Sequence, residues 1–242
     1  MMGISNAQKS AYNILTSVLG QVITIVLGVV IPRLVLVNLG SENNGLLSSI
    51  TQVLGYASLL EAGVGLASLQ ALYKPVAEHD ETSVNAIMSA TNLYYRRTGI
   101  AYLLTVIILS AIYPVIIKSS LPYGTITIVV LISGLPGVVN YYFQGKYKIL
   151  LQAEGRTYII TNLATVIGIL TSIGKILLLL LGFGVIAVQS LHLALSLVQM
   201  IYTDYYIRKN YAWIDLTAAP AYDKLSQRNS VLAHQLSGTI FS

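Results

Sequence analysis

Long, nearly uninterrupted apolar stretches constrain this chain more than any other feature of its sequence. An α-helix needs about 20 consecutive apolar residues to cross the hydrocarbon core of a bilayer. Six stretches have the length and character of spans: residues 12–39, 46–73, 98–117, 125–142, 158–181 and 185–206. The third of these can start as early as residue 87, and a further apolar segment begins near residue 230. The sequence therefore predicts an all-α integral membrane protein with six transmembrane helices and the start of a seventh.

The composition excludes several other classes of protein. Of the 242 residues, 55% are hydrophobic and only 10% are charged, whereas a soluble domain has about 25% charged residues. Such a chain cannot cover a folded surface with solvated groups, which argues against a soluble enzyme, a disordered protein and a nucleic-acid-binding domain. The chain has no cysteine, so it has no disulfide, no thiolate zinc site and no cysteine nucleophile.

The basic residues predict the orientation in the membrane. If the six stretches cross in turn, Lys118 lies alone on one side, and Arg33 and Lys175 fall within spans. Cytoplasmic loops carry an excess of Lys and Arg, so the more basic side, with the N-terminus, is predicted to be cytoplasmic. The basic residues on that side are Lys9, Lys74, Arg96, Arg97, Lys146, Lys148, Arg156, Arg208, Lys209, Lys224 and Arg228.

The longest polar stretch follows the sixth span, and it suggests how the chain is divided. We expect residues 1–209 to form an N-terminal six-helix bundle, residues 210–229 a cytoplasmic inter-bundle linker, and residues 230–242 the start of a truncated seventh helix. This arrangement is typical of one half of a two-bundle transporter. The alternative is a six-span protein whose C-terminal tail lies along the membrane surface.

Glu61 is the most informative single residue. It lies near the middle of the second stretch, where a charge costs about 2.5–3.5 kcal/mol on insertion scales. Its sequence neighbours provide no cation one helical turn away. One interpretation is a protonatable carboxylate that couples proton or cation movement to a conformational change. The other is a structural carboxyl group that is protonated or hydrogen-bonded across helices.

Five further polar residues are candidates for lining a substrate cavity: Arg33, Gln52, Arg96, Arg97 and Lys175. Each has an alternative explanation. Arg33 can anchor to lipid phosphate, Arg96 and Arg97 can mark the inner membrane interface, and Lys175 can extend to the outer headgroups. Gln52 can be a hydrogen-bonding group between helices.

The fourth span and the loops hold the remaining sequence features that bear on chemistry. The segment 134–137, Gly-Leu-Pro-Gly, is predicted to break the fourth span, either to bend or unwind it for a binding site or without function. The loops contain no serine–histidine–acid set, no pair of catalytic carboxylates and no spacing of metal ligands. We therefore predict no enzyme activity, no cofactor and no metal.

The first 75 or so residues resemble a known family. The matching segments are IPRLVL at 31–36, NLGSENNGL at 38–46, SSITQVL at 48–54, LLEAGVG at 59–65 and ALYKP at 71–75. Together they resemble the N-terminal half of bacterial oligosaccharide flippases of the polysaccharide transporter family. That family belongs to the multidrug/oligosaccharidyl-lipid/polysaccharide exporter superfamily.

The resemblance implies twelve to fourteen helices in two bundles around a central cavity, which moves undecaprenyl-pyrophosphate-linked sugar units across the bacterial inner membrane by alternating access. It implies a cationic cavity, for which Arg33, Arg96, Arg97 and Lys175 are the candidates, and a coupling role for Glu61. The implied partners are lipid-linked oligosaccharide, membrane lipids, a second transporter half and polysaccharide assembly proteins, with no nucleic acid. A multidrug/cation antiporter of the same superfamily, and an inactive membrane fragment or scaffold, are the competing interpretations.

Overall fold

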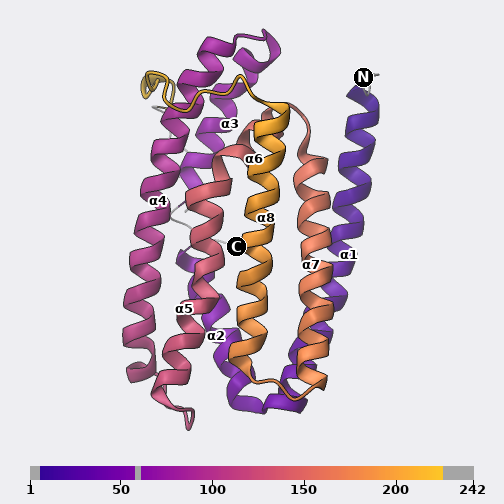
Figure 1. The fold of residues 1–242 in the computed structure, drawn as a ribbon, viewed down its shortest axis with the longest axis vertical. Helices are drawn as coiled ribbons and strands as arrows, with labels where there is room; N and C mark the ends of the chain where they lie inside the picture. The colour runs from indigo at the N-terminus through magenta and orange to yellow at the C-terminus, as the bar shows by residue number, and fades with distance from the viewer. Residues whose placement is uncertain (1–5, 58–60, 226–242) are drawn as a thin grey trace, which may run out of the picture.

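The described residues, 6–57 and 61–225, form a bundle of helices without strands in a computed structural model (Figure 1). The chain crosses the bundle in alternating directions, with α2 and α3 running the same way and α6 continuing α5, so the same end holds the start of α1 and the end of α8 (Figure 1). The α-helices are α1 (Asn6–Leu39), α2 (Ser41–Ala57), α3 (Ala62–Ala77), α4 (Glu81–Ile116), α5 (Tyr123–Val139), α6 (Gly145–Ala153), α7 (Thr157–Leu180) and α8 (Val185–Asn210).

Five helical stretches in the described part are long and apolar enough to cross a membrane. This finding confirms the predicted all-helical class with several helices of membrane-spanning length. The five are Gly20–Leu39 within α1, Glu81–Ile116, Tyr123–Ala153, Thr157–Leu180 and Val185–Asn210.

The predicted second span is not one helix. The stretch 46–73 is divided between α2 and α3, which have 17 and 16 residues. Figure 1 shows α2 toward the end of the bundle where α1 finishes, and α3 toward the opposite end. Glu61 occupies the N-cap position of α3. The residue singled out for its cost in a continuous span therefore lies where a new helix begins.

The predicted break at residues 134–137 was wrong. Helix α5 continues through Pro136, and the two glycines of this segment instead allow α4 to approach closely. An added Cβ would lie 2.5 Å from Val106 at Gly134 and 2.6 Å from Tyr102 at Gly137. The glycines are explained by packing, because a larger side chain there would collide with α4.

The irregularity lies further along the same helix. Residues Asn140–Gln144 form a π-helical turn, η2, in which the Gly145 N–H donates to the Asn140 carbonyl. Helix α6 then continues to Ala153. Lys146 and Lys148, which had been assigned to a cytoplasmic loop, are therefore helical residues inside a 31-residue candidate span.

The principal buried core lies between α3, α4, α6 and the segment after α8. Leu72, Ile87 and Leu150 are completely buried within it. Residues 211–225, most of the predicted linker, cross the end of the bundle over α3 and α4 (Figure 1). They are held by a backbone hydrogen bond of 3.1 Å from the Ala221 N–H to the Ala86 carbonyl. The predicted seventh helix at 230–242 lies outside the described residues.

Candidate functional site

Glu61 and Tyr95 form the centre of the candidate site. The Tyr95 hydroxyl of α4 donates a hydrogen bond to Glu61 Oε1. Tyr95 is only 1% exposed, whereas Glu61 is partly buried. A buried hydroxyl without a partner would be costly, so the carboxyl group satisfies Tyr95 and is itself oriented by it.

Two glycines create the space for this hydrogen bond. An added Cβ at Gly65 on α3 would lie 2.9 Å from Glu61 Oε1 and 3.1 Å from the Tyr95 hydroxyl. An added Cβ at Gly145 would lie 2.0 Å from Cε1 of the Tyr95 ring. The ring is thus enclosed by the backbones of two helices, α3 and α6, which fixes the position of its hydroxyl group.

A cation reaches the site from α6. Lys148 Nζ donates to the side-chain oxygen of Asn140 in the π-helical turn, and Lys148 is close enough to Glu61 for their charges to interact. Opposite charges removed from water attract strongly. The cation that was missing from the sequence around Glu61 is therefore supplied by another helix.

The arrangement brings together a carboxyl group, a phenol, an ammonium group and a helix junction. A proton arriving at Glu61 would remove the negative charge that attracts Lys148 and would change the hydrogen bond with Tyr95. The site can therefore link a change in protonation to a change in the packing of α3 against α4 and α6. Within the described residues no three His, Asp or Glu side chains converge as a metal site would require.

The five predicted cavity residues are dispersed. Arg33 on α1, Gln52 on α2 and Arg97 on α4 are exposed. Arg96 is also exposed, and its guanidinium lies 5.5 Å from the centre of the Tyr142 ring. Lys175 on α7 is partly buried.

Lys175 lies in a separate polar region of the bundle. It is close enough to His192 on α8 for an electrostatic interaction. One turn earlier on α8, the Gln189 amide donates a 2.8 Å hydrogen bond to the Ser133 hydroxyl of α5. These contacts connect α7, α8 and α5, and they are separate from the contacts described for Glu61.

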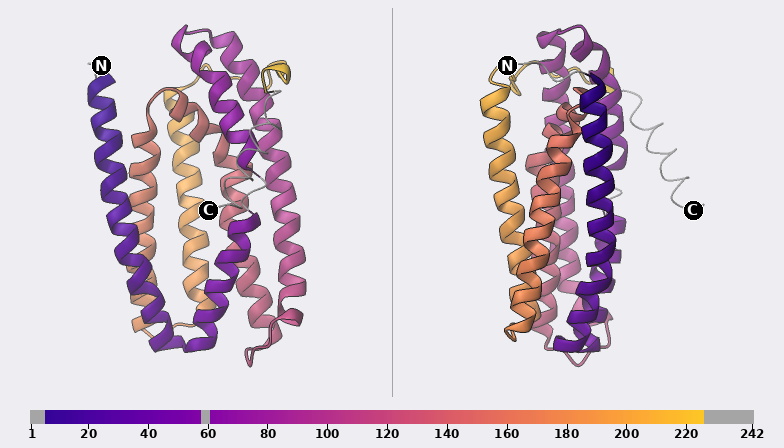
Figure 2. Two further views of the ribbon diagram at one scale, coloured as in Figure 1. Left: turned by 180° about the vertical axis from the view of Figure 1, so that it is seen from behind. Right: turned by 90° about the vertical axis from the view of Figure 1, so that its right-hand side faces the viewer.

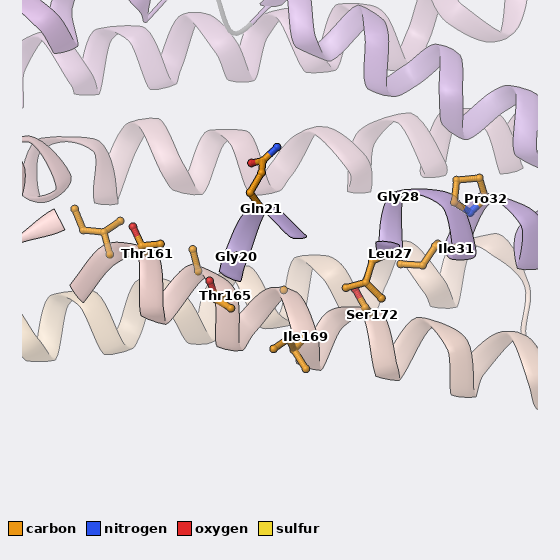
Figure 3. A pocket seen from close by; sticks show the side chains of 13 residues that line it. Gly20, Gln21, Leu27, Gly28, Ile31, Pro32, Thr161, Thr165, Ile169 and Ser172 are labelled. Carbon is orange, nitrogen blue, oxygen red and sulfur yellow. The ribbon is translucent and has the colours of Figure 1, made fainter. Parts of the chain in front are cut away.

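A groove of about 730 Å³ lies between α1 and α7. Gln21, Thr161, Thr165 and Ser172 supply its polar lining among apolar and small residues (Figure 3). An added Cβ at Gly168 would meet no atom within 4 Å, so this part of the groove is open. Arg33 is adjacent to the lining residue Pro32, but none of the five predicted cavity residues lines the groove.

Sequence reasoning identified Glu61 but missed Tyr95, Asn140 and Lys148. Nothing in the sequence around Tyr95 or Asn140 indicates a site, and Lys148 enters the sequence argument only through the orientation in the membrane. A signal was present, because apolar residues continue through Ile149, Leu150 and Leu151 after the two lysines. That continuation favours a longer helix, which places Lys148 inside the bundle.

Comparisons of the chain with protein-family models, with curated proteins and with solved structures found no significant match in any of the three. The family resemblance of residues 31–75 therefore remains a prediction.

Proposed function

We propose that this chain forms one six-helix half of a transporter that moves lipid-linked oligosaccharide across the bacterial inner membrane for surface polysaccharide biosynthesis. In this proposal α2 and α3 together form one crossing, which brings the five candidate spans to a total of six. The end of the bundle with most of the basic residues faces the cytoplasm, following the distribution of Lys and Arg in the loops. The cargo is an undecaprenyl-pyrophosphate-linked sugar unit, as the resemblance of residues 31–75 implies.

The observation that carries the proposal is the position of Glu61 at the junction of α2 and α3. Discontinuous helices are common at the binding and coupling sites of transporters. Here the junction holds an ionisable group that contacts Tyr95 and interacts with Lys148. Proton binding that favours one packing arrangement over another shifts the balance between two conformations, and alternating access requires such a shift.

A multidrug/cation antiporter is the second candidate, because the same carboxylate can couple proton movement to export of an organic cation. The two candidates differ in cargo and share the role of Glu61. A membrane scaffold or an inactive fragment would move neither cargo.

The test is transport in proteoliposomes that contain the complete transporter, with this chain as one of its two halves. The probe is a fluorescent undecaprenyl-pyrophosphate-linked N-acetylglucosamine, whose movement between leaflets is followed by chemical quenching from outside, with and without an imposed pH gradient. We expect gradient-dependent movement by the unchanged protein. We expect Glu61→Gln to abolish the dependence on the gradient, because glutamine cannot bind and release a proton.

Glu78→Gln is the matched control, because Glu78 is an exposed glutamate at the opposite end of α3. It should transport like the unchanged protein. Full gradient dependence in Glu61→Gln would overturn the coupling role. Gradient-driven export of ethidium without movement of the lipid would identify the antiporter, and movement of neither probe would contradict transport by this chain.

A further inference from the structure

A second pocket lies between the π-helical turn with α6 on one side and α8 on the other. It has a volume of about 450 Å³ and is separate from both the α1–α7 groove and Glu61. The polar and aromatic side chains that carry the argument are Gln144, Lys146 and Tyr147 on the first side, and Asp204, Tyr205 and Arg208 on the second.

Two of these side chains, Lys146 and Gln144, are deeply buried, and the side-chain oxygen of Gln144 lacks a hydrogen-bond partner among the described residues. Lys146 is 7% exposed, and no carboxylate within the described residues forms an ion pair with it; its Nζ lies 4.9 Å from the centre of the Tyr147 ring. Gln144 is 3% exposed, and its Oε1 has no hydrogen-bond partner among the described residues. An unpaired buried polar group is costly, so Gln144 indicates a ligand, and Lys146 provides a positive charge in the same pocket.

The surrounding charges favour an anion. Arg96 and Asp204 are the charged groups that act on Lys146. The Asp204 carboxylate is already engaged by Arg208, at 2.6 Å between Oδ2 and Nε. Within the part of the chain that the structure describes, neither Arg96 nor Lys146 forms an ion pair with a carboxylate, so positive charge is in excess around the pocket.

The depth of the pocket matches the boundary between acyl chains and headgroups. The candidate span Tyr123–Ala153 has 31 residues, or about 46 Å of helix, against a hydrocarbon core of about 30 Å. About 8 Å therefore extends beyond the hydrocarbon at each end. Lys146 precedes the end of α6 at Ala153 by seven residues, or about 10 Å, which places it close to that boundary.

The rim of the pocket is apolar and open. Ile201 and Tyr205 on α8 are 63% and 59% exposed, and Phe143 in the π-helical turn is 44% exposed. A ligand here would place a charged group against Lys146 and an apolar group along exposed apolar side chains. Lipids that combine a phosphate with acyl chains have this distribution.

We propose that this pocket binds the phosphate headgroup of an anionic membrane phospholipid of the phosphatidylglycerol type. Lys146 donates to the phosphate oxygens, and Gln144 Oε1 accepts a hydrogen bond from a headgroup hydroxyl. The acyl chains lie along the apolar rim formed by Phe143, Ile201 and Tyr205. Free inorganic phosphate shares only the first of these contacts, so the source of the phosphate can be tested.

Because the chain has no cysteine, a single introduced cysteine provides a unique site for a fluorescent label. Ile201→Cys places the label on the pocket rim, and Val198→Cys places it at an exposed position of α8 outside the lining. Both proteins are reconstituted in bilayers that contain brominated phosphatidylglycerol or brominated phosphatidylcholine at equal mole fraction. We expect a preference of about fivefold for phosphatidylglycerol at Ile201, since one lysine near an anionic lipid contributes that factor, and no preference at Val198.

Lys146→Gln in the Ile201→Cys protein should remove the preference, and Lys146→Arg should retain it. Lys74→Gln is the matched control, because Lys74 is an exposed lysine at the same end of the bundle that does not line the pocket. Equal quenching by both lipids at Ile201, or an equal loss of preference with Lys74→Gln, would overturn the proposal. Loss of the preference on adding inorganic phosphate would overturn the lipid as the ligand.

Discussion

The two sides of the bundle are packed very differently. Around α3, α4 and α6, side chains such as Ile87, Met88 and Leu150 are completely buried. On the other side, α1 contacts α7 along the edge seen in Figure 2, yet Val35 is the only buried side chain among those described on α1. Val29 and Val37 of α1 are 69% and 73% exposed.

This difference shows what holds each side together. Lipid chains are as apolar as leucine, so apolar surface alone does not drive helices together in a bilayer. The α3–α4–α6 side uses close backbone approach, as at Gly145, and hydrogen bonds between helices, such as the 3.0 Å bond from Thr91 to Ser68. The α1–α7 side has glycines too, but at Gly28 and Gly168 nothing fills the space beside them.

The largest effect on stability should come from adding a methyl group at a glycine on the tightly packed side. The same change at a glycine on the α1–α7 side is the matched comparison. Gly145→Ala places a Cβ 2.0 Å from the Tyr95 ring, and overpacking of this kind should lower the free energy of unfolding by about 3 kcal/mol. Gly168→Ala meets no atom within 4 Å and should leave the free energy of unfolding unchanged or raise it by up to about 1 kcal/mol, because alanine favours the helix more than glycine does. Unfolding in detergent followed by circular dichroism measures both, and equal effects would refute the contrast in packing.

A smaller effect is expected where residues 211–225 attach to the tightly packed side. The Asn85 side chain donates to the Trp213 carbonyl at 3.2 Å and accepts from the Asp215 N–H at 2.9 Å. Asn85→Ala should destabilise this attachment by about 1 kcal/mol. Trp213 is the only tryptophan of the chain, so its emission should shift to longer wavelength as the segment detaches.

Asn38→Ala is the matched control for this variant. Asn38 donates only to the Leu34 carbonyl of its own helix, α1. Its replacement should leave the emission of Trp213 unchanged. The same spectrum for both variants would show that Asn85 does not hold the segment.

The smallest effect should appear at the start of α4. Asp80 caps this helix by accepting from the Ser83 N–H at 3.0 Å. Hydrogen bonds from the Ser83 side chain and backbone lower the pKa of the Asp80 carboxyl below its usual value. Stability from this group is therefore fully present above its unfolded pKa of about 3.9 and is lost as the pH falls through the lower folded value.

Melting temperatures at pH 7 and pH 3 test this prediction. Asp80→Ala should melt slightly below the unchanged protein at pH 7, and the difference should shrink at pH 3. Asp80→Asn should retain most of the cap while removing this pH dependence. A difference that is the same at both pH values would mean that ionised Asp80 does not stabilise α4.

The sequence predicted α7 and the start of α8 closely because apolar residues predominate in both segments and polar residues or glycines mark their ends. It placed the start of α4 too late, at residue 98 or at the earliest near 87, although the helix begins at Glu81. Ser89, Thr91 and Asn92 are polar but buried against other parts of the chain. Hydropathy detects contact with lipid, so it underestimates a helix whose first half packs against protein.

The candidate site was predictable only in part for a related reason. An acidic residue in an apolar stretch is conspicuous, and Glu61 was identified on that basis. Its surroundings depend on where α6 runs, and the charges of Lys146 and Lys148 indicated a loop. Only a packed structure can show that one of these lysines lies within electrostatic range of a carboxylate far away in the sequence.

The π-helical turn sets the rotation of α6 about its own axis. A turn with one residue more than an α-helical turn rotates the next helix by about 100° relative to an uninterrupted one. Lys146 and Lys148 are two positions apart, about 200° around α6, so one faces the α8 pocket while the other faces Asn140. The extra residue thus changes which way the two side chains point, and it places one ammonium group at the pocket and the other at Asn140, within electrostatic range of Glu61.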